Sequence, residues 1–166
     1  MGTAGIVTSM SETTAQRLAD YILISACKRG LLVTNLKLQK LLYYSQAWRL
    51  AITGKPLFND RIEAWIHGPV VPPVFGIFKH FRASPINAIP FDGTIEPGDG
   101  DRSIQEHVAE ILDVYAGFTG SELETLTHQE GPWLEARKGL AADEPSNNVI
   151  SHDSMRAFYS TQLVAQ

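Results

Sequence analysis

The sequence predicts a mainly α fold, a compact single-domain helical structure with one short extended or β-hairpin segment around residues 57–67. Three observations support this prediction. Apolar residues recur every three to four positions over most of the chain, as they do along one face of a helix. Alternation of apolar and polar residues is clearest at residues 62–67, between the turn-forming residues Asn59-Asp60 and Gly68-Pro69. A length of 166 residues is typical of one domain.

The sequence predicts one domain at residues 12–160, with tails at residues 1–11 and 161–166. Periodicity is lost over residues 82–102, where Pro85, Pro90 and Pro97 predict a long connection between helices.

Helix starts are predicted from capping boxes, from a serine cap and from prolines, which suit the first turn of a helix because they lack a backbone N–H. The predicted starts are Thr13 with Gln16, Pro72 with Pro73, Ser103 with Glu106, Ser121 with Glu124, Pro132 with Trp133, and Ser151.

A helix from Thr34 to about Thr53, followed by Gly54, is the most apolar of the predicted elements. Its polar residues form only a narrow stripe, so we expect the helix to be central. Lys40 and Tyr44 lie one turn apart outside this stripe, which places a cation among aromatic and aliphatic neighbours.

The formal net charge of −4 conceals an uneven distribution of charge. Residues 1–91 carry ten Lys and Arg against four Asp and Glu, whereas residues 92–166 carry four against fourteen. We expect internal pairing between the two halves and an exposed acidic surface. A single Cys27 excludes an intramolecular disulfide and favours a cytoplasmic location, and no segment is long and apolar enough for a membrane helix.

The sequence lacks the common catalytic and cofactor motifs, including phosphate-binding glycine loops, G-x-S-x-G and H-E-x-x-H. We therefore predict no catalytic residues, no metal and no cofactor. His67 and His128 lie in turn-rich segments, where a neutral imidazole commonly satisfies backbone groups. A hydrolase built around these two histidines is the enzymatic alternative.

A DNA-binding regulator is a second alternative, because the segment from the first predicted helix to residue 53 has the proportions of a helix-turn-helix. Its base-reading residues would be Asn35, Lys37, Gln39 and Lys40. The apolar residues around that helix argue against its entry into a groove, so nucleic acid is not the expected partner.

Five segments in order resemble the Panacea domain family of SocA-like, phage-associated antitoxins. They are TNLKLQKLLYYSQAW at residues 34–48, PLF at 56–58, EAW at 63–65, GPVVP at 68–72 and LTHQEGPW at 126–133. The resemblance spans about residues 12–160. The sequence departs from the family pattern at His67, where a tyrosine often precedes the Gly-Pro-Val turn.

This resemblance implies an antitoxin that neutralises a cognate protein toxin by direct binding, without catalysis. Some relatives instead deliver a toxin to an ATP-dependent protease, and a homodimer is a further arrangement left open. Large aromatic side chains bury a large area when they lie in a core. We therefore assign a structural role to the tryptophans of the motifs and to the motif residues around them: Leu41, Trp48, Trp65, Gly68, Pro69, Pro132 and Trp133. The candidate partner-binding residues are Lys40, Tyr44, Glu63, His67 and His128. Pairing of Lys40 with Glu63 inside the fold is an equal alternative to an intermolecular contact.

Overall fold

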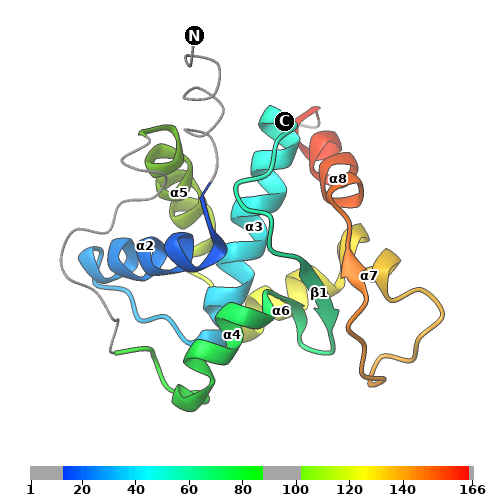
Figure 1. Cartoon of the computed structure of the whole chain (residues 1–166), viewed down its shortest axis with the longest axis horizontal. Helices are drawn as coiled ribbons and strands as arrows, with labels where there is room; N and C mark the ends of the chain where they lie inside the picture. The colour runs from blue at the N-terminus through cyan, green and yellow to red at the C-terminus, as the bar shows by residue number, and fades with distance from the viewer. Residues whose placement is uncertain (1–12, 88–101, 165–166) are drawn as a thin grey trace, which may run out of the picture.

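The computed structural model describes residues 13–87 and 102–164 (Figure 1). The described elements, in order, are α2 (Ala15–Lys28), α3 (Asn35–Thr53), β1 (Ile62–Trp65), β2 (Gly68–Val70), α4 (Pro72–Phe78), the 3₁₀ helix η1 (Lys79–Phe81), α5 (Arg102–Tyr115), α6 (Gly120–His128), α7 (Gly131–Ala136), β3 (Val149–Ile150) and α8 (His152–Val164). The mainly α prediction is confirmed. The predicted tail at residues 1–11 and most of the predicted connection at 82–102 lie outside the described residues.

Helix α3 forms the centre of the fold, and fourteen of its nineteen residues are buried. Helices α2, α5, α6 and α8 and the β-hairpin all contact it (Figure 1). The Thr34 hydroxyl accepts from the Lys37 amide at 3.2 Å, and Gly54 ends the helix with a left-handed φ of 77°. Both predicted ends of this helix are therefore confirmed.

The polar stripe of α3 lies inside the protein, where its glutamine side chains form hydrogen bonds with the backbone of neighbouring loops. The Gln46 side chain accepts from the Leu57 amide at 2.7 Å and donates to the Phe58 carbonyl at 2.8 Å. The Gln39 side chain accepts from the Val71 amide at 2.9 Å. Each pairing satisfies groups that would be costly to bury alone.

The predicted extended segment is an antiparallel hairpin of β1 and β2 that lies at residues 62–70, slightly later than expected. Strand β3 pairs with the other edge of β1, which gives the sheet order β2-β1-β3. No pattern in the sequence predicts β3, because a two-residue strand is too short to show an alternating pattern.

Three predicted helix starts are wrong. Thr14, rather than Thr13, caps α2 by accepting from the Arg17 amide. Helix α5 already begins at Arg102, so Ser103 lies within its first turn. Helix α6 has a capping box formed by Thr119 and Glu122 and not by Ser121 and Glu124. The two patterns overlap in the sequence, and only the earlier threonine has the extended backbone that a cap requires.

The prolines at the starts of α4 and α7 and the Ser151 cap of α8 occupy the expected positions. Helix α8 continues to Val164, so the segment predicted as a C-terminal tail begins within its last turns. None of the helices in the described ranges is both long and apolar enough to cross a membrane.

Candidate functional site

A cavity of about 1020 Å³ lies between α3, the hairpin, α4 with η1, and residues 145–147. Its mainly apolar wall includes Leu36, Trp65, Ile66, Val70 and Phe75. Three candidate residues from the sequence analysis, Lys40, Glu63 and His67, line the same cavity. We call this cavity the hairpin pocket.

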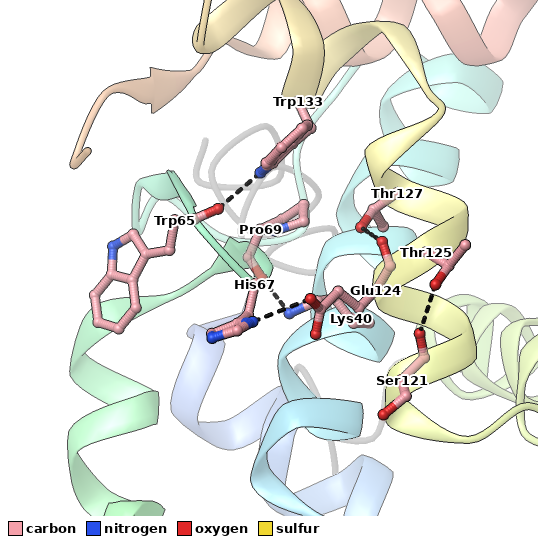
Figure 2. A network of polar contacts seen from close by, with 9 residues as sticks. All are labelled: Lys40, Trp65, His67, Pro69, Ser121, Glu124, Thr125, Thr127 and Trp133. Atoms are coloured by element: carbon pink, nitrogen blue, oxygen red, sulfur yellow. Dashed lines mark hydrogen bonds and ion pairs between the residues drawn. The ribbon is translucent and has the colours of Figure 1, made fainter. Parts of the chain in front are cut away.

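Lys40 lines the hairpin pocket and has no solvent-exposed surface. Its Nζ atom donates to the Pro69 carbonyl at 3.1 Å (Figure 2). Gly68 makes this approach feasible, because a Cβ atom there would lie 2.5 Å from Lys40 Cε. Burial lowers the pKa of Lys40 to about 7, and the opposing influence of Glu124 is smaller. The site therefore holds an amine that changes charge near neutral pH.

Glu124 of α6 lies beside both Lys40 and His67 (Figure 2). The His67 Nδ1 atom lies 3.0 Å from Glu124 Oε2, and the His67 side chain is largely exposed. Because Thr119 and Glu122 cap α6, the Glu124 carboxylate is not used in the cap and can face the hairpin. The capping-box spacing of Ser121 and Glu124 predicts a cap, so the sequence pattern does not indicate that Glu124 belongs to the site.

Glu63 is buried on β1 but does not form an ion pair with Lys40. Its Oε2 atom accepts from Arg61 Nε at 2.8 Å, and its Oε1 atom accepts from Trp65 Nε1 at 2.9 Å. The internal Lys40–Glu63 pair considered from the sequence is therefore replaced by an Arg61–Glu63–Trp65 cluster.

His128 lies close enough to Glu124 and His67 to interact with both electrostatically, but it does not line the hairpin pocket. Its ring stacks on Trp133 with centroids 4.0 Å apart. Burial lowers the pKa of His128. Among the described residues, neither His67 nor His128 hydrogen-bonds to a serine, threonine or cysteine side chain, the contact that a nucleophile needs.

Tyr44 belongs to a separate buried network and has no exposed surface for a partner. Its hydroxyl donates to Glu130 Oε1 at 2.6 Å, and its ring stacks on Tyr115 with centroids 4.0 Å apart. Burial, followed by the Glu130 charge, raises the pKa of Tyr44. We therefore reassign Tyr44 to the core.

The residues assigned structural roles link the elements around α3. Trp48 Nε1 donates to the Tyr115 hydroxyl at 2.7 Å, and Trp133 Nε1 donates to the Trp65 carbonyl at 2.8 Å. Trp65 differs from the others because its half-buried ring also lines the hairpin pocket. The buried positions of this set are Leu41, Gly68, Pro69, Pro132 and Trp133.

The helix of the DNA-binding alternative has no side free to enter a groove. Lys37 Nζ donates to the Ala116 carbonyl at 2.6 Å, and Asn35 donates to the Phe75 carbonyl at 3.1 Å. Gln39 and Lys40 are likewise buried. Residues that would read bases are therefore used inside the fold.

Lys79 and Arg82 also line the hairpin pocket, although neither is among the candidate residues predicted from the sequence. Both are exposed. No motif marks them. They reach this cavity because α4, which η1 follows directly, packs on α3 and brings the Phe75 ring against Trp65 of the hairpin.

Comparison with known proteins places the chain in a family. The family described as "Antitoxin SocA-like, Panacea domain" matches residues 38–134. Antitoxin SocA from Caulobacter vibrioides (strain NA1000 / CB15N) is 32% identical over 143 residues, which cover 81% of this chain and 73% of that protein. No solved structure matches the chain significantly. These two matches show that the chain belongs to the SocA-like antitoxin family with a Panacea domain.

Proposed function

We propose that this chain is an antitoxin that neutralises a cognate protein toxin by direct, stoichiometric binding, without catalysis, metal or cofactor. The similarity to antitoxin SocA over 81% of the chain carries this proposal. The fold suits the role, since a central buried helix holds the surrounding elements in fixed positions and leaves a preformed pocket at the surface.

The test is expression of the protein encoded next to this chain's gene, alone and together with this chain. The neighbour alone should arrest growth, and the pair should restore growth and co-purify at a fixed ratio. A neighbour that is harmless alone, or that does not co-purify, would contradict the proposal.

Delivery of the toxin to an ATP-dependent protease is the second mode of the same binding function. It predicts that the half-life of the toxin in cells becomes shorter when this chain is present. Simple inhibition predicts an unchanged half-life, so a pulse-chase measurement separates the two modes.

Three finer parts of the proposal concern the setting in which the chain acts. The single cysteine, Cys27, is a free and exposed thiol, which suits a reducing cytoplasm. The family resemblance supports a phage or prophage origin, and the genes that flank this one test it. A homodimer would be detected by light scattering of the purified chain.

A further inference from the structure

The hairpin pocket is large enough to hold several side chains of a partner. A cavity of about 150 Å³ accommodates one benzene ring, and drug-sized ligands occupy roughly 300–1,000 Å³. The hairpin pocket, at about 1020 Å³, reaches the upper end of this range. Its walls come from segments that are far apart in the sequence, so its shape depends on the complete fold.

A fixed aromatic pair forms part of the wall. The rings of Trp65 and Phe75 meet edge to face with centroids 5.1 Å apart. The hydrogen bond from Trp65 Nε1 to Glu63 further restricts the indole. A ring held in this way loses little conformational freedom on binding, and tryptophan and arginine are enriched among the residues that contribute most to interfaces.

The uncharged polar side chains deep in the pocket already have partners within the protein. Asn35 donates to the Phe75 carbonyl and accepts from Gln39 Nε2 at 2.9 Å. Gln39 accepts from the Val71 amide. The electrostatic character of the pocket is therefore set by its charged residues.

Each acidic residue of the pocket lies beside a basic residue, whereas the cations at its rim form no ion pair within the described ranges. Glu63 pairs with Arg61, and Glu124 contacts His67 and lies near Lys40. Lys79 and Arg82 are exposed and form no ion pair with another residue in the described ranges. A binding partner would therefore complement the positive charge of Lys79 and Arg82 with a negatively charged group.

The backbone of Arg82 gives an independent reason to assign it a function. Arg82 has a φ of 53° and a ψ of −124° and is the one non-glycine residue with a positive φ in the described parts of the chain. Such a conformation is unfavourable for a residue with a side chain and is often found at ligand-binding positions. Glycine would suit this backbone better, but it would remove the guanidinium.

From these observations we infer that the hairpin pocket is the docking site for the protein toxin, and that it takes an extended toxin segment in which apolar side chains adjoin an acidic group. The apolar side chains pack on Trp65 and Phe75, and the acidic group pairs with Lys79 and Arg82. This inference rests on the proposed antitoxin function and adds the chemistry of the segment that is recognised.

The first test uses labelled synthetic pentapeptides and the intact chain, so it does not depend on the identity of the toxin. Fluorescence anisotropy compares acetylated, amidated peptides of sequence Asp-Leu-Phe-Leu-Asp, Lys-Leu-Phe-Leu-Lys and Asp-Ser-Ser-Ser-Asp. The first should bind at least about tenfold more tightly than the other two, since one tenfold step corresponds to only about 1.4 kcal/mol. Absence of binding, or equal binding of the acidic and basic apolar peptides, would overturn the inference.

Charge-reversal variants locate the binding. Lys79→Glu combined with Arg82→Glu should abolish the preference for the acidic peptide. The control combines Lys55→Glu with Lys138→Glu, which changes the net charge equally at exposed residues outside the pocket and should preserve the preference. Phenylacetate serves as a competitor. If it binds more tightly than the acidic peptide, the pocket is a small-molecule site and the docking inference is wrong.

Arg82→Gly separates a binding role from a structural one. This change relieves the backbone strain, so the melting temperature should rise by about 2–4 °C while the acidic peptide binds at least about tenfold more weakly. Unchanged peptide affinity would overturn the role of Arg82.

The growth assay distinguishes failure of this inference from failure of the proposed function. If the Lys79→Glu, Arg82→Glu variant still neutralises the toxin, the antitoxin function stands and the docking inference is wrong. If the unaltered chain fails to neutralise its neighbour, the proposed function is contradicted, and peptide binding still decides the character of the pocket.

Discussion

Lys40 couples the stability of the fold to pH. Burial lowers its pKa to about 7, whereas a lysine in the unfolded chain has a pKa of about 10.4. Between these values the unfolded chain binds more protons, so the free energy of unfolding should rise with pH over this window, by at most about 1.4 kcal/mol per pH unit. Below pH 7 the amine is protonated in both states and adds no further slope.

Lys40→Met should remove this contribution because methionine fills similar space without a titratable group. Urea unfolding at pH 7, 8 and 9 measures the effect. The unaltered chain should gain more stability over this range than the variant. An equal gain in both would show that Lys40 does not cause the pH dependence.

Gly68 is required where the hairpin turn meets Lys40. Its φ is +104°, and an added Cβ would lie 2.5 Å from Lys40 Cε and 3.0 Å from Thr127 Oγ1. Gly68→Ala should therefore lower the free energy of unfolding by about 1–3 kcal/mol or more. Gly76→Ala is the control, since that helical glycine has no atom within 4 Å of the new methyl group and should lose no stability in a urea titration.

At the scale of elements, the capping of α6 decides which carboxylate is available to the pocket. Thr119 accepts from the Glu122 amide at 3.1 Å, and Glu122 accepts from the Thr119 amide at 2.9 Å. Thr119→Ala should cost about 1 kcal/mol of stability, whereas Ser121→Ala should change it by less than about 0.5 kcal/mol. Chemical denaturation of both variants tests this order, and the reverse order would assign the cap to Ser121.

The extent and the central position of helix α3 can be predicted from the sequence, but the partners of its polar stripe cannot. Thr34 and Gly54 mark its ends in the sequence as well as in the structure. The polar stripe, however, would ordinarily indicate a solvated face. In the fold, Gln39 and Gln46 instead bond to the backbone of loops at 56–58 and 71, contacts that no helical period encodes.

At the scale of the whole molecule, Tyr159 joins the last helix to the centre. Its hydroxyl lies 3.1 Å from the Glu130 carboxylate and 3.1 Å from the Tyr43 hydroxyl. Because Tyr159 has one hydroxyl proton, it donates to Glu130 and accepts from Tyr43. Burial raises the pKa of Glu130, and the hydrogen bonds from Tyr44 and Tyr159 oppose this rise.

Tyr159→Phe should cost about 1–3 kcal/mol at neutral pH, because a largely buried carboxylate loses a donor. The same loss raises the pKa of Glu130 further. The deficit should therefore shrink as the pH falls and the carboxyl becomes protonated. Thermal unfolding at neutral and acidic pH tests this, with Tyr21→Phe on α2 as the control, and a deficit independent of pH would exclude the Glu130 contact as its cause.

The uneven charge distribution is partly explained by burial. Lys37, Lys40 and Arg49 of the basic half are buried on α3, so they add little to the surface charge. Arg29 and Asp113 form an ion pair between the two halves at 2.7 Å. Both partners are substantially exposed, so this pair contributes about 0–1 kcal/mol and does not by itself hold the halves together.

The sequence by itself determined the helical fold, the central position of α3, the hairpin and the family, because periodicity, capping residues and motif order are local properties of the chain. Only the tertiary structure decided which polar residues meet. It separated Tyr44 from Lys40, replaced the Lys40–Glu63 pair by contacts with Pro69 and Arg61, and brought Glu124 to His67. It also assembled the hairpin pocket from α3, the hairpin, η1 and residues 145–147. These contacts join segments that are far apart in the chain, and burial and packing in three dimensions select among their partners.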